Sequence, residues 1–288
     1  MSSVNGPMAG RTVVVTGATS GIGQATAVGL GRMGARVAVG GRDRARADAV
    51  ADEVRAAGGT AEVFVADLSS QTEVRRLAGD LLEQLSRIDV LVNNVGGYWD
   101  TRHVTVDGLE RTFTVNHLAP FLLTNLLLDR LVQSGPARVV TVASDAQSMG
   151  RIAFGDLQDE RAYSGSRAYN QSKLANVMFT YELARRLRAT SVTANALHPG
   201  LVSTSFGAED PAIVQRLVVP FLRPFMKSAA RGATTSIHLA SDPGLERVSG
   251  LFFAKSKPVK SSRQSYDEAA AARLWQVSAD LVALSAAA

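Results

Sequence analysis

The sequence predicts a single α/β domain of the doubly wound kind, built on a mostly parallel seven-stranded sheet. Short runs rich in β-branched residues alternate with amphipathic stretches through most of the 288 residues, as in a parallel sheet covered by helices on both faces. The 46% content of hydrophobic residues can fill a large core, and no Pro/Gly/Ser-rich linker divides the chain. We expect an N-terminal tail at residues 1–9 and one domain at residues 10–288.

The predicted elements alternate from the start of the domain. Each strand is a short apolar run, and each helix is a longer stretch whose apolar residues recur at helical spacing. In chain order they are strand 12–16, helix 21–33, strand 36–39, helix 44–57, strand 61–66, helix 71–85, strand 90–93, helix 109–131, strand 138–143, helix 168–187, strand 191–197, helix 229–240 and strand 250–253. The alanine-rich C-terminal end is also expected to be helical. Such a sheet binds ligands beyond the carboxyl ends of its strands.

One stretch departs from this alternation. Over residues 206–227 the periodic pattern loosens into apolar side chains with interspersed charge. We interpret residues 205–228 as a lid over an apolar substrate. A segment that lies on a membrane surface, one that packs against another subunit, or an ordinary pair of packed helices would fit the same pattern.

Composition excludes several classes of function. The chain has no cysteine, so it has neither disulfides nor thiolate metal sites, and its four histidines are dispersed without the spacing of metal ligands, so no metal is expected. The net charge of +5 comes mostly from scattered arginines opposed by 26 acidic residues, without a nucleic-acid-binding motif, so no nucleic-acid partner is expected. No apolar run has the length of a transmembrane segment, and no signal sequence is evident, so we expect a cytoplasmic protein.

A glycine-rich turn follows the first predicted strand and opens the first long helix. Its glycines are Gly17, Gly21 and Gly23. Without side chains there, backbone amides and the positive end of the helix can approach a pyrophosphate. A tight strand-to-helix turn could need glycine for its shape alone, but the order of strand, turn and helix favours a dinucleotide.

The residues after the second predicted strand indicate which dinucleotide. Gly41 stands where an acidic side chain would accept hydrogen bonds from the adenosine ribose, and Arg42 follows it. A guanidinium there can make paired bonds to a 2′-phosphate, so NADP(H) is expected over NAD(H). Asp43 keeps NAD(H) open, and Arg42 could instead be an ordinary solvated arginine.

Tyr169 and Lys173 indicate proton transfer. They are four residues apart on a predicted helix, so both side chains lie on one face. A phenol titrates near ~10 and exchanges protons poorly at neutral pH unless a nearby positive charge lowers its pKa. An ordinary surface pair would have the same spacing, and the glycine-rich turn upstream is what favours a catalytic one.

Further motifs follow in a fixed order. They are Thr16-Gly17-Ala18-Thr19-Ser20-Gly21-Ile22-Gly23, Asp67-Leu68, Asn93-Asn94-Val95-Gly96, Asn116, Ser144, Tyr169 with Lys173, and Pro199-Gly200. Together they resemble the short-chain dehydrogenase/reductase family over residues 10–284. The resemblance implies a Rossmann-like fold and hydride transfer to or from C4 of a nicotinamide.

The resemblance also implies the binding and catalytic roles. Tyr169 would exchange a proton with the substrate oxygen, Ser144 would hold that oxygen, Lys173 would lower the pKa of the phenol and grip the ribose, and Asn116 would support a water-linked proton path. Ser144 could alternatively cap a helix or turn. Asp67 would bind the adenine edge, the Asn93-Asn94 segment would support the adenosine side, and the loop from Pro199 to Thr204 would hold the nicotinamide amide. The full set of expected cofactor-binding residues is Gly17, Thr19, Ser20, Gly21, Ile22, Gly23, Arg42, Asp67, Leu68, Asn93, Asn94, Gly96, Tyr169, Lys173, Pro199, Gly200, Val202 and Thr204.

Two features depart from the common family pattern. Val95 stands where alanine is usual, and Ser144 is 25 residues before Tyr169, which implies an inserted loop beside the substrate. That interval, together with motifs such as His198-Pro199-Gly200 and Arg273-Leu274-Trp275, looks most like the retinol-dehydrogenase-like branch. The resemblance implies an apolar alcohol, aldehyde or ketone as substrate.

The sequence thus predicts an NADP(H)-dependent oxidoreductase that acts on a small apolar alcohol or carbonyl compound. A non-catalytic NADP(H)-binding sensor or partner-binding protein of the same fold is the alternative, and the intact catalytic set argues against it. A sugar-nucleotide epimerase fits less well because its glycine turn is usually spaced differently. The helices at 109–131 and 168–187 could form a two-fold interface in a homodimer or homotetramer, unless a C-terminal extension blocks one face.

Overall fold

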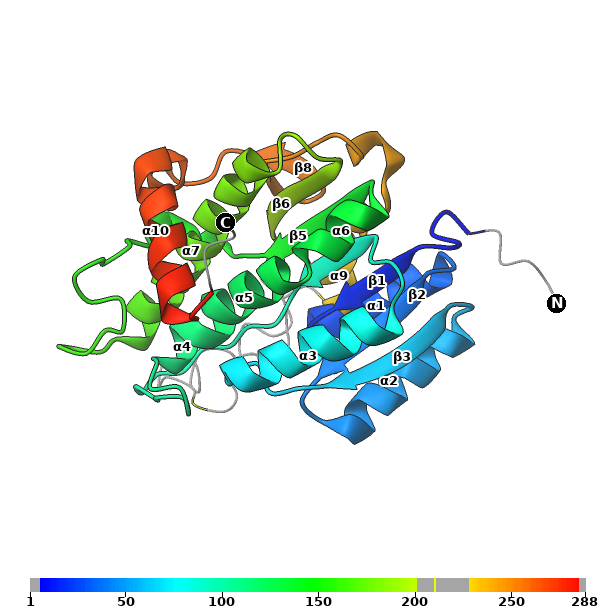
Figure 1. Cartoon of the computed structure of the whole chain (residues 1–288), viewed down its shortest axis with the longest axis horizontal. Coiled ribbons are helices and arrows are strands. Elements are labelled where there is room, and N and C mark those ends of the chain that lie inside the picture. Colours follow the sequence, from blue (N-terminus) through cyan, green and yellow to red (C-terminus); the bar gives the residue numbers. More distant parts are fainter. Residues whose placement is uncertain (1–5, 201–209, 211–227, 285–288) are drawn as a thin grey trace.

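The computed structural model describes residues 6–200, 210 and 228–284 and consists of one α/β domain (Figure 1). Its sheet has eight strands in the order β3-β2-β1-β4-β5-β6-β7-β8, and only β7 and β8 pair antiparallel. Their bounds are β1 Thr12–Val15, β2 Arg36–Gly41, β3 Thr60–Val65, β4 Val90–Asn93, β5 Ala137–Val142, β6 Val192–His198, β7 Phe252–Ala254 and β8 Lys257–Val259. The order reverses between β1 and β4, as expected for a doubly wound sheet.

Helices cover both faces of the sheet. On one face α1, α2 and α9 pack, and on the other α3, α5, α7 and α10, with α3, α5 and α10 in front in Figure 1. Their bounds are α1 Gly21–Arg32, α2 Arg44–Ala56, α3 Gln71–Gln84, α4 Arg111–Phe113, α5 Ala119–Leu126, α6 Leu128–Ser134, α7 Gly165–Arg186, α9 Ala229–Ser241 and α10 Glu268–Leu281. Shorter helical turns are η1 Thr114–Leu118, η2 Asp145–Met149, η4 Pro243–Leu245 and η5 Arg263–Tyr266.

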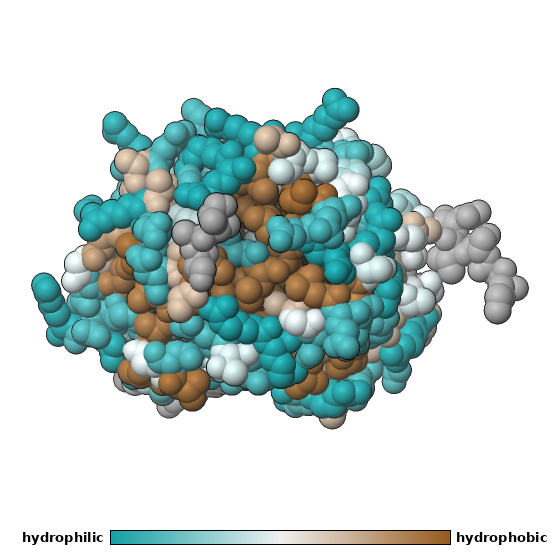
Figure 2. All heavy atoms as spheres, in the orientation of Figure 1, coloured by the Kyte–Doolittle hydropathy of each residue, from teal (hydrophilic) through white to brown (hydrophobic). Residues whose placement is uncertain are grey.

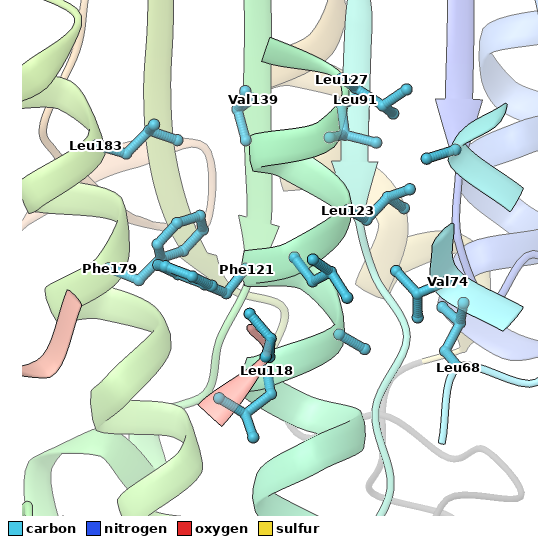
Figure 3. Close-up of a cluster of buried hydrophobic side chains, with 14 of the residues drawn as sticks. Leu68, Val74, Leu91, Leu118, Phe121, Leu123, Leu127, Val139, Phe179 and Leu183 are labelled. Atoms are coloured by element: carbon cyan, nitrogen blue, oxygen red, sulfur yellow. The ribbon is translucent and has the colours of Figure 1, made fainter. Parts of the chain in front are cut away.

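The alternation of side chains along each strand builds two cores. In β1, Val13 and Val15 point to the side of α1 and α9, whereas Val14 points to the side of α3 and α5. In β4, Leu91 belongs to the core on the side of α3 and α5. Figure 3 shows this core, with side chains from α3, α5 and α7 packed against the sheet. Because both faces are covered, the strands are apolar on both sides, which explains the continuous valine runs.

The C-terminal helix α10 packs along α7. Its Trp275 stacks on Phe179 of α7 at 5.7 Å between ring centroids and packs edge-on against Phe121 of α5 at 5.0 Å. The guanidinium of Arg186 lies 4.3 Å from the centre of the Trp275 ring. The chain itself therefore covers part of the helix face that the sequence suggested for a two-fold interface.

Two predicted elements differ from the structure. The sheet has an eighth strand because Lys255 and Ser256 adopt positive φ angles of 51° and 58° and turn the chain back after β7. The predicted helix at residues 109–131 is broken into α4, a π-helical turn at Thr114–Leu118, α5 and α6. The eighth strand is formed by a local hairpin, whereas the break in the helix goes with contacts of Asn116 to distant parts of the chain.

On the face shown in Figure 2, apolar surface gathers near the centre, over α5 and α6. Leu126 and Leu128 there are partly buried, and Val132 is 40% exposed. Across residues 6–200, 210 and 228–284, no helix has both the length and the apolar character needed to cross a bilayer.

Candidate active site

The glycine-rich turn leaves β1 and enters α1 in a backbone shape that needs glycine. Gly17 and Gly21 have positive φ angles of 62° and 56°. At Gly23, a Cβ would lie 2.2 Å from the carbonyl oxygen of Gly17, so no side chain fits. The turn is therefore tight, and its backbone carries no side chains at Gly17, Gly21 and Gly23.

The amino end of α1 has no side-chain cap. Its N-cap residue, Ser20, makes no capping hydrogen bond, whereas α2, α3, α7, α9 and α10 are each capped by an Asp or Ser side chain. The first amides of α1 therefore remain available to an acceptor from outside the helix. This arrangement fits a bound pyrophosphate, as the sequence predicts for Gly17, Thr19, Ser20, Gly21, Ile22 and Gly23.

Asn94 stabilises the glycine-rich turn through hydrogen bonds to its backbone. Its side-chain amide donates to the carbonyl oxygens of Thr16 and Gly17 at 3.0 and 3.1 Å, and the hydroxyl of Thr16 accepts from the backbone amides of Asn94 and Val95. The side chain of Asn93 points the other way, under α5, where it donates to the Thr124 hydroxyl at 2.9 Å. Of this pair, Asn94 shapes the cofactor turn, and Asn93 anchors a helix.

Gly41 ends β2 and Arg42 follows it, at the carboxyl end of the strand, and Arg42 is exposed. A Cβ on Gly41 would lie only 2.2 Å from the methyl group of Thr19. Any larger side chain there must displace Thr19, which is itself part of the glycine-rich turn. An acidic side chain that would bind a free ribose 2′-hydroxyl therefore fits at this position only if the Thr19 side chain moves.

The side chains of Tyr169, Lys173 and Ser144 lie close together at the carboxyl end of β5. Tyr169 and Lys173 project from one face of α7, with the Lys173 ammonium 5.6 Å from the centre of the Tyr169 ring. Ser144, two residues after β5, hydrogen-bonds to the Tyr169 side chain, and its hydroxyl also accepts from the Ala146 amide at 3.2 Å. Ser144 thus caps the turn at η2, the alternative role expected for it, and its predicted contact with the substrate oxygen stays a prediction.

Asn116 is completely buried at the π-helical turn and is held by three hydrogen bonds. Its Nδ2 donates to the Gly97 carbonyl and the Ser172 hydroxyl, each at 3.0 Å, and its Oδ1 accepts from the Gly97 amide at 2.7 Å. A Cβ on Gly96 would lie 3.2 Å from both Asn116 Oδ1 and Lys173 Nζ. These two polar atoms therefore face the same small space, which Gly96 leaves open.

Burial dominates the protonation of the central pair. It raises the pKa of Tyr169 to about 12, an effect that the hydrogen bond with Ser144 partly opposes, and it lowers the pKa of Lys173 to about 8. The lysine Nζ donates to the carbonyl oxygen of Val142 at 3.2 Å. The predicted lowering of the phenol pKa by Lys173 is not seen in the chain alone and stays a prediction for the cofactor-bound protein.

The remaining predicted residues lie at the same edge or outside the described part. Asp67 and Leu68 follow β3, and Pro199 and Gly200 follow β6, Gly200 with a φ of 90°. Val202 and Thr204, and the lid expected at residues 205–228 except for Asp210 and Ser228, lie outside the described residues.

The sequence predicts no site role for two further residues, Ser172 and His198. Ser172 receives a hydrogen bond from Asn116 and donates to the Tyr169 carbonyl oxygen at 2.8 Å, so it joins the π-helical turn to α7. His198 Nδ1 accepts from the backbone amide of Asp145, the residue after Ser144, at 3.0 Å. No role follows from their positions in the sequence, and their contacts in the structure reveal one.

The inserted stretch between Ser144 and α7 lies along the side of α7. Gln171 fixes it by accepting from the Ala153 amide at 2.8 Å and donating to the Leu157 carbonyl at 3.1 Å. A cavity of about 310 Å³ lies between this stretch and α7, lined in part by Met149, Ala168 and Gln171. Ala168 and Gln171 point away from the face that carries Tyr169 and Lys173, so the cavity is not beside the phenol.

Known proteins share both the sequence and the fold. The family model described as short chain dehydrogenase matches residues 11–212. Human retinol dehydrogenase 14 is 44% identical, over 97% of this chain and 88% of its own length. An uncharacterised protein from Mycobacterium paratuberculosis, known from a crystal structure, is 38% identical with a TM-score of 0.79, over 98% of this chain and 97% of its own. RhlG of Pseudomonas aeruginosa, solved as an active-site complex with NADP, is 30% identical with a TM-score of 0.69, over 88% of this chain and 97% of its own.

Proposed function

The chain belongs to the short-chain dehydrogenase family, and on that premise we propose that it is an NADP(H)-dependent oxidoreductase that interconverts an apolar alcohol and its aldehyde or ketone. The observation that carries the proposal is the convergence of Tyr169, Lys173, Ser144 and Asn116 beside an open glycine-rich turn. The family supports an oxidoreductase, and the finer assignments below are the proposal.

The glycine-rich turn and the uncapped start of α1 would hold the pyrophosphate of the cofactor. Asp67 and Leu68 would lie at the adenine, and Pro199 and Gly200 would lead into the loop at the nicotinamide amide. When bound, the nicotinamide supplies or accepts the hydride.

The preference for NADP(H) rests on Gly41, Thr19 and Arg42. Thr19 opposes an acidic side chain at position 41, and the exposed Arg42 can pair with a 2′-phosphate. The NADP complex of the RhlG relative supports the same preference.

The side chains divide the proton chemistry among themselves. Tyr169 would give its proton to the substrate oxygen during reduction and take it back during oxidation, while the Ser144 hydroxyl holds that oxygen. Lys173, with a pKa of about 8 in its buried position, would gain or lose a proton readily near neutral pH. In its ammonium form it would stabilise the Tyr169 phenolate. Asn116 Oδ1 and Lys173 Nζ, which face the space beside Gly96, would hold the water that replaces the proton.

The substrate class follows from relatives and from the proposed lid. The similarity to human retinol dehydrogenase 14 favours an apolar alcohol or carbonyl substrate. The apolar sequence of residues 205–228 would suit a cover over such a molecule.

Replacement of the phenol tests the proposal. Tyr169→Phe should reduce kcat by about 10²-fold to 10⁴-fold because the proton carrier is lost, while the dissociation constant for NADP(H) stays within about twofold. The measurement is NADPH absorbance with a panel of apolar aldehydes and ketones, and cofactor binding by fluorescence titration.

Tyr266→Phe is the matched control, because Tyr266 is 51% exposed on η5 and takes no part in the site. It should retain full turnover. Retained turnover in Tyr169→Phe would refute the assignment, and a wild-type protein that binds NADP(H) but turns over no compound of the panel would favour a cofactor-binding sensor.

A further inference from the structure

Tyr98 packs against the proposed proton carrier. The rings of Tyr98 and Tyr169 are 5.9 Å apart between centroids and inclined at 67°, an edge-to-face arrangement. Tyr98 is only 8% exposed, and its hydroxyl donates to Asp100 Oδ1 at 3.0 Å. Its ring therefore has a fixed position beside the phenol.

The backbone around Tyr98 is fixed as firmly as its side chain. The Asn116 amide clamps the preceding residue, Gly97, through both its N–H and its C=O. The loop also lies directly on the start of α7, because a Cβ on Gly165 would be 2.4 Å from the Trp99 carbonyl oxygen and 3.0 Å from the Tyr98 hydroxyl. Gly165 is four residues before Tyr169, so the same helical turn carries the support and the reacting group.

Tyr169 also makes polar contacts. Ser144 hydrogen-bonds to its side chain, and Lys173 on the same helix lies 5.6 Å from its ring centre. Lys173 and Tyr98 are titratable groups in contact with it, and Asp100 and Asp210 act in turn on Tyr98. Among these contacts Tyr98 alone is aromatic.

We propose that Tyr98 is a positioning residue for Tyr169: its ring holds the plane of the phenol and keeps water from that side of the reacting hydroxyl. The inference rests on the proposed role of Tyr169. It assigns the loop after β4 a part in the reaction in addition to any contact with the cofactor.

The protonation of both tyrosines agrees with this role. Burial raises the pKa of Tyr169 to about 12, and Tyr98 is part of what buries it. Burial, followed by the hydrogen bond to Asp100, raises the pKa of Tyr98 itself to about 12, so Tyr98 stays neutral while the enzyme works. Tyr98 therefore shapes the site and exchanges no proton.

Two substitutions separate the ring from its hydroxyl. Tyr98→Leu removes the aromatic edge, and we expect kcat to fall about tenfold because the phenol is less well placed, while the dissociation constant for NADP(H) changes less than about twofold. Tyr98→Phe keeps the ring and loses only the bond to Asp100, so it should retain kcat within about twofold. Equal losses in the two variants, or none in Tyr98→Leu, would overturn the proposal. Thermal unfolding of each variant identifies losses caused by misfolding, and Tyr98→Met then replaces a leucine variant that fails to fold.

A second measurement does not depend on turnover. The chain has 5 tyrosines, so incorporation of 3-fluorotyrosine gives few ¹⁹F resonances, which single Tyr→Phe variants assign. Titration of the Tyr169 resonance, with and without NADP(H), should show a lower pKa in Tyr98→Leu than in wild type and no change in Tyr98→Phe. An unchanged pKa in Tyr98→Leu would refute the shielding. If wild type proved inactive, the proposed function would fail, yet this titration would still show whether Tyr98 shields Tyr169.

Discussion

Burial decides the protonation of several single side chains in this protein. Tyr169 and Lys173 both move toward their neutral forms, with pKa values of about 12 and about 8. Their spacing on α7 follows from the sequence, but the strength of this effect depends on the strands and loops that exclude water from them. A cofactor phosphate or ribose nearby would change it again.

At the residue scale, Arg42 determines the predicted cofactor preference. Arg42→Ala should weaken NADP(H) binding by about 10-fold to 100-fold, the value of a charge-assisted hydrogen bond to phosphate, and leave NAD(H) binding nearly unchanged. Arg44→Ala is the control, since Arg44 is exposed and pairs with Asp48 on α2. Cofactor titration checks this, and a similar loss for both cofactors would contradict the assignment.

His117 is a buried histidine that no proton chemistry uses. It is fully buried between Asn176 on α7 and Ser278 on α10, at 3.3 and 2.9 Å, and burial lowers its pKa from 6.5 to about 4. The unfolded chain therefore binds a proton between pH 6.5 and 4 that the folded chain does not. His117 thus makes the folded protein less stable as the pH falls through this window.

From this difference we expect the free energy of unfolding to fall by about 2 kcal/mol between pH 7 and pH 5 on account of His117. His117→Gln should lose most of that dependence, although it lowers stability at pH 7. His103→Gln is the control, because His103 is 43% exposed and pairs with Asp210 at the surface. Urea unfolding at both pH values makes the comparison, and an unchanged pH dependence in His117→Gln would exclude this source.

At the element scale, the broken helix between Glu110 and Ser134 is the main departure from the sequence prediction. The residues have helical periodicity, but the Asn116 amide bonds to Gly97 and Ser172, and the backbone widens into a π-helical turn at that point. The partners of Asn116 come from a loop and from α7. Local propensity therefore predicts a helix there but not its interruption.

Alanine substitutions at two helical glycines, Gly165 and Gly79, compare a position in close contact with a neighbouring loop with a position in open space. Gly165 begins α7 against the Trp99 carbonyl, so Gly165→Ala should destabilise the protein by about 1–3 kcal/mol and lower kcat by displacing the loop of Tyr98. Gly79 lies in α3 with nothing within 4 Å of its would-be Cβ, so Gly79→Ala should stabilise by about 0.5–1 kcal/mol. Thermal and denaturant unfolding compare them, and an equal effect of the two changes would contradict the close contact.

At the scale of the whole molecule, the carboxyl ends and the amino ends of the parallel strands have different roles. The predicted site residues lie at or beyond the carboxyl ends of the strands, whereas Asp89 joins strands at the amino ends. Asp89 is 2% exposed and accepts from the Thr12 amide at 2.8 Å and from Arg11 and Arg87. This cluster holds the start of β1 to the start of β4.

We therefore expect Asp89→Ala to reduce the free energy of unfolding by about 3 kcal/mol, because it leaves buried donors unpaired, while kcat of the folded protein is unchanged. Asp52→Ala removes only an exposed pair with Arg55 and should cost less than about 0.5 kcal/mol. A large loss of kcat in Asp89→Ala, at a temperature where this variant is folded, would show that the cluster at the amino ends of the strands affects the site at their carboxyl ends.

The assembly of the molecule is also a question at this scale. α10 covers part of α7 and α5 through Trp275, which limits the two-fold interface suggested by the sequence. The apolar surface over α5 and α6 remains exposed, so a homodimer or homotetramer stays a prediction.

The sequence by itself determined the doubly wound fold, the order of its elements and the identity of the candidate site, because strand alternation, glycine in tight turns and the spacing of Tyr169 and Lys173 are local properties. Only the tertiary structure decided that the Thr19 side chain lies against position 41, that Asn116 bonds to Gly97, and that Tyr98 packs on Tyr169. These contacts join segments that are distant in the chain, and steric exclusion and burial depend on which surfaces meet after the chain has folded.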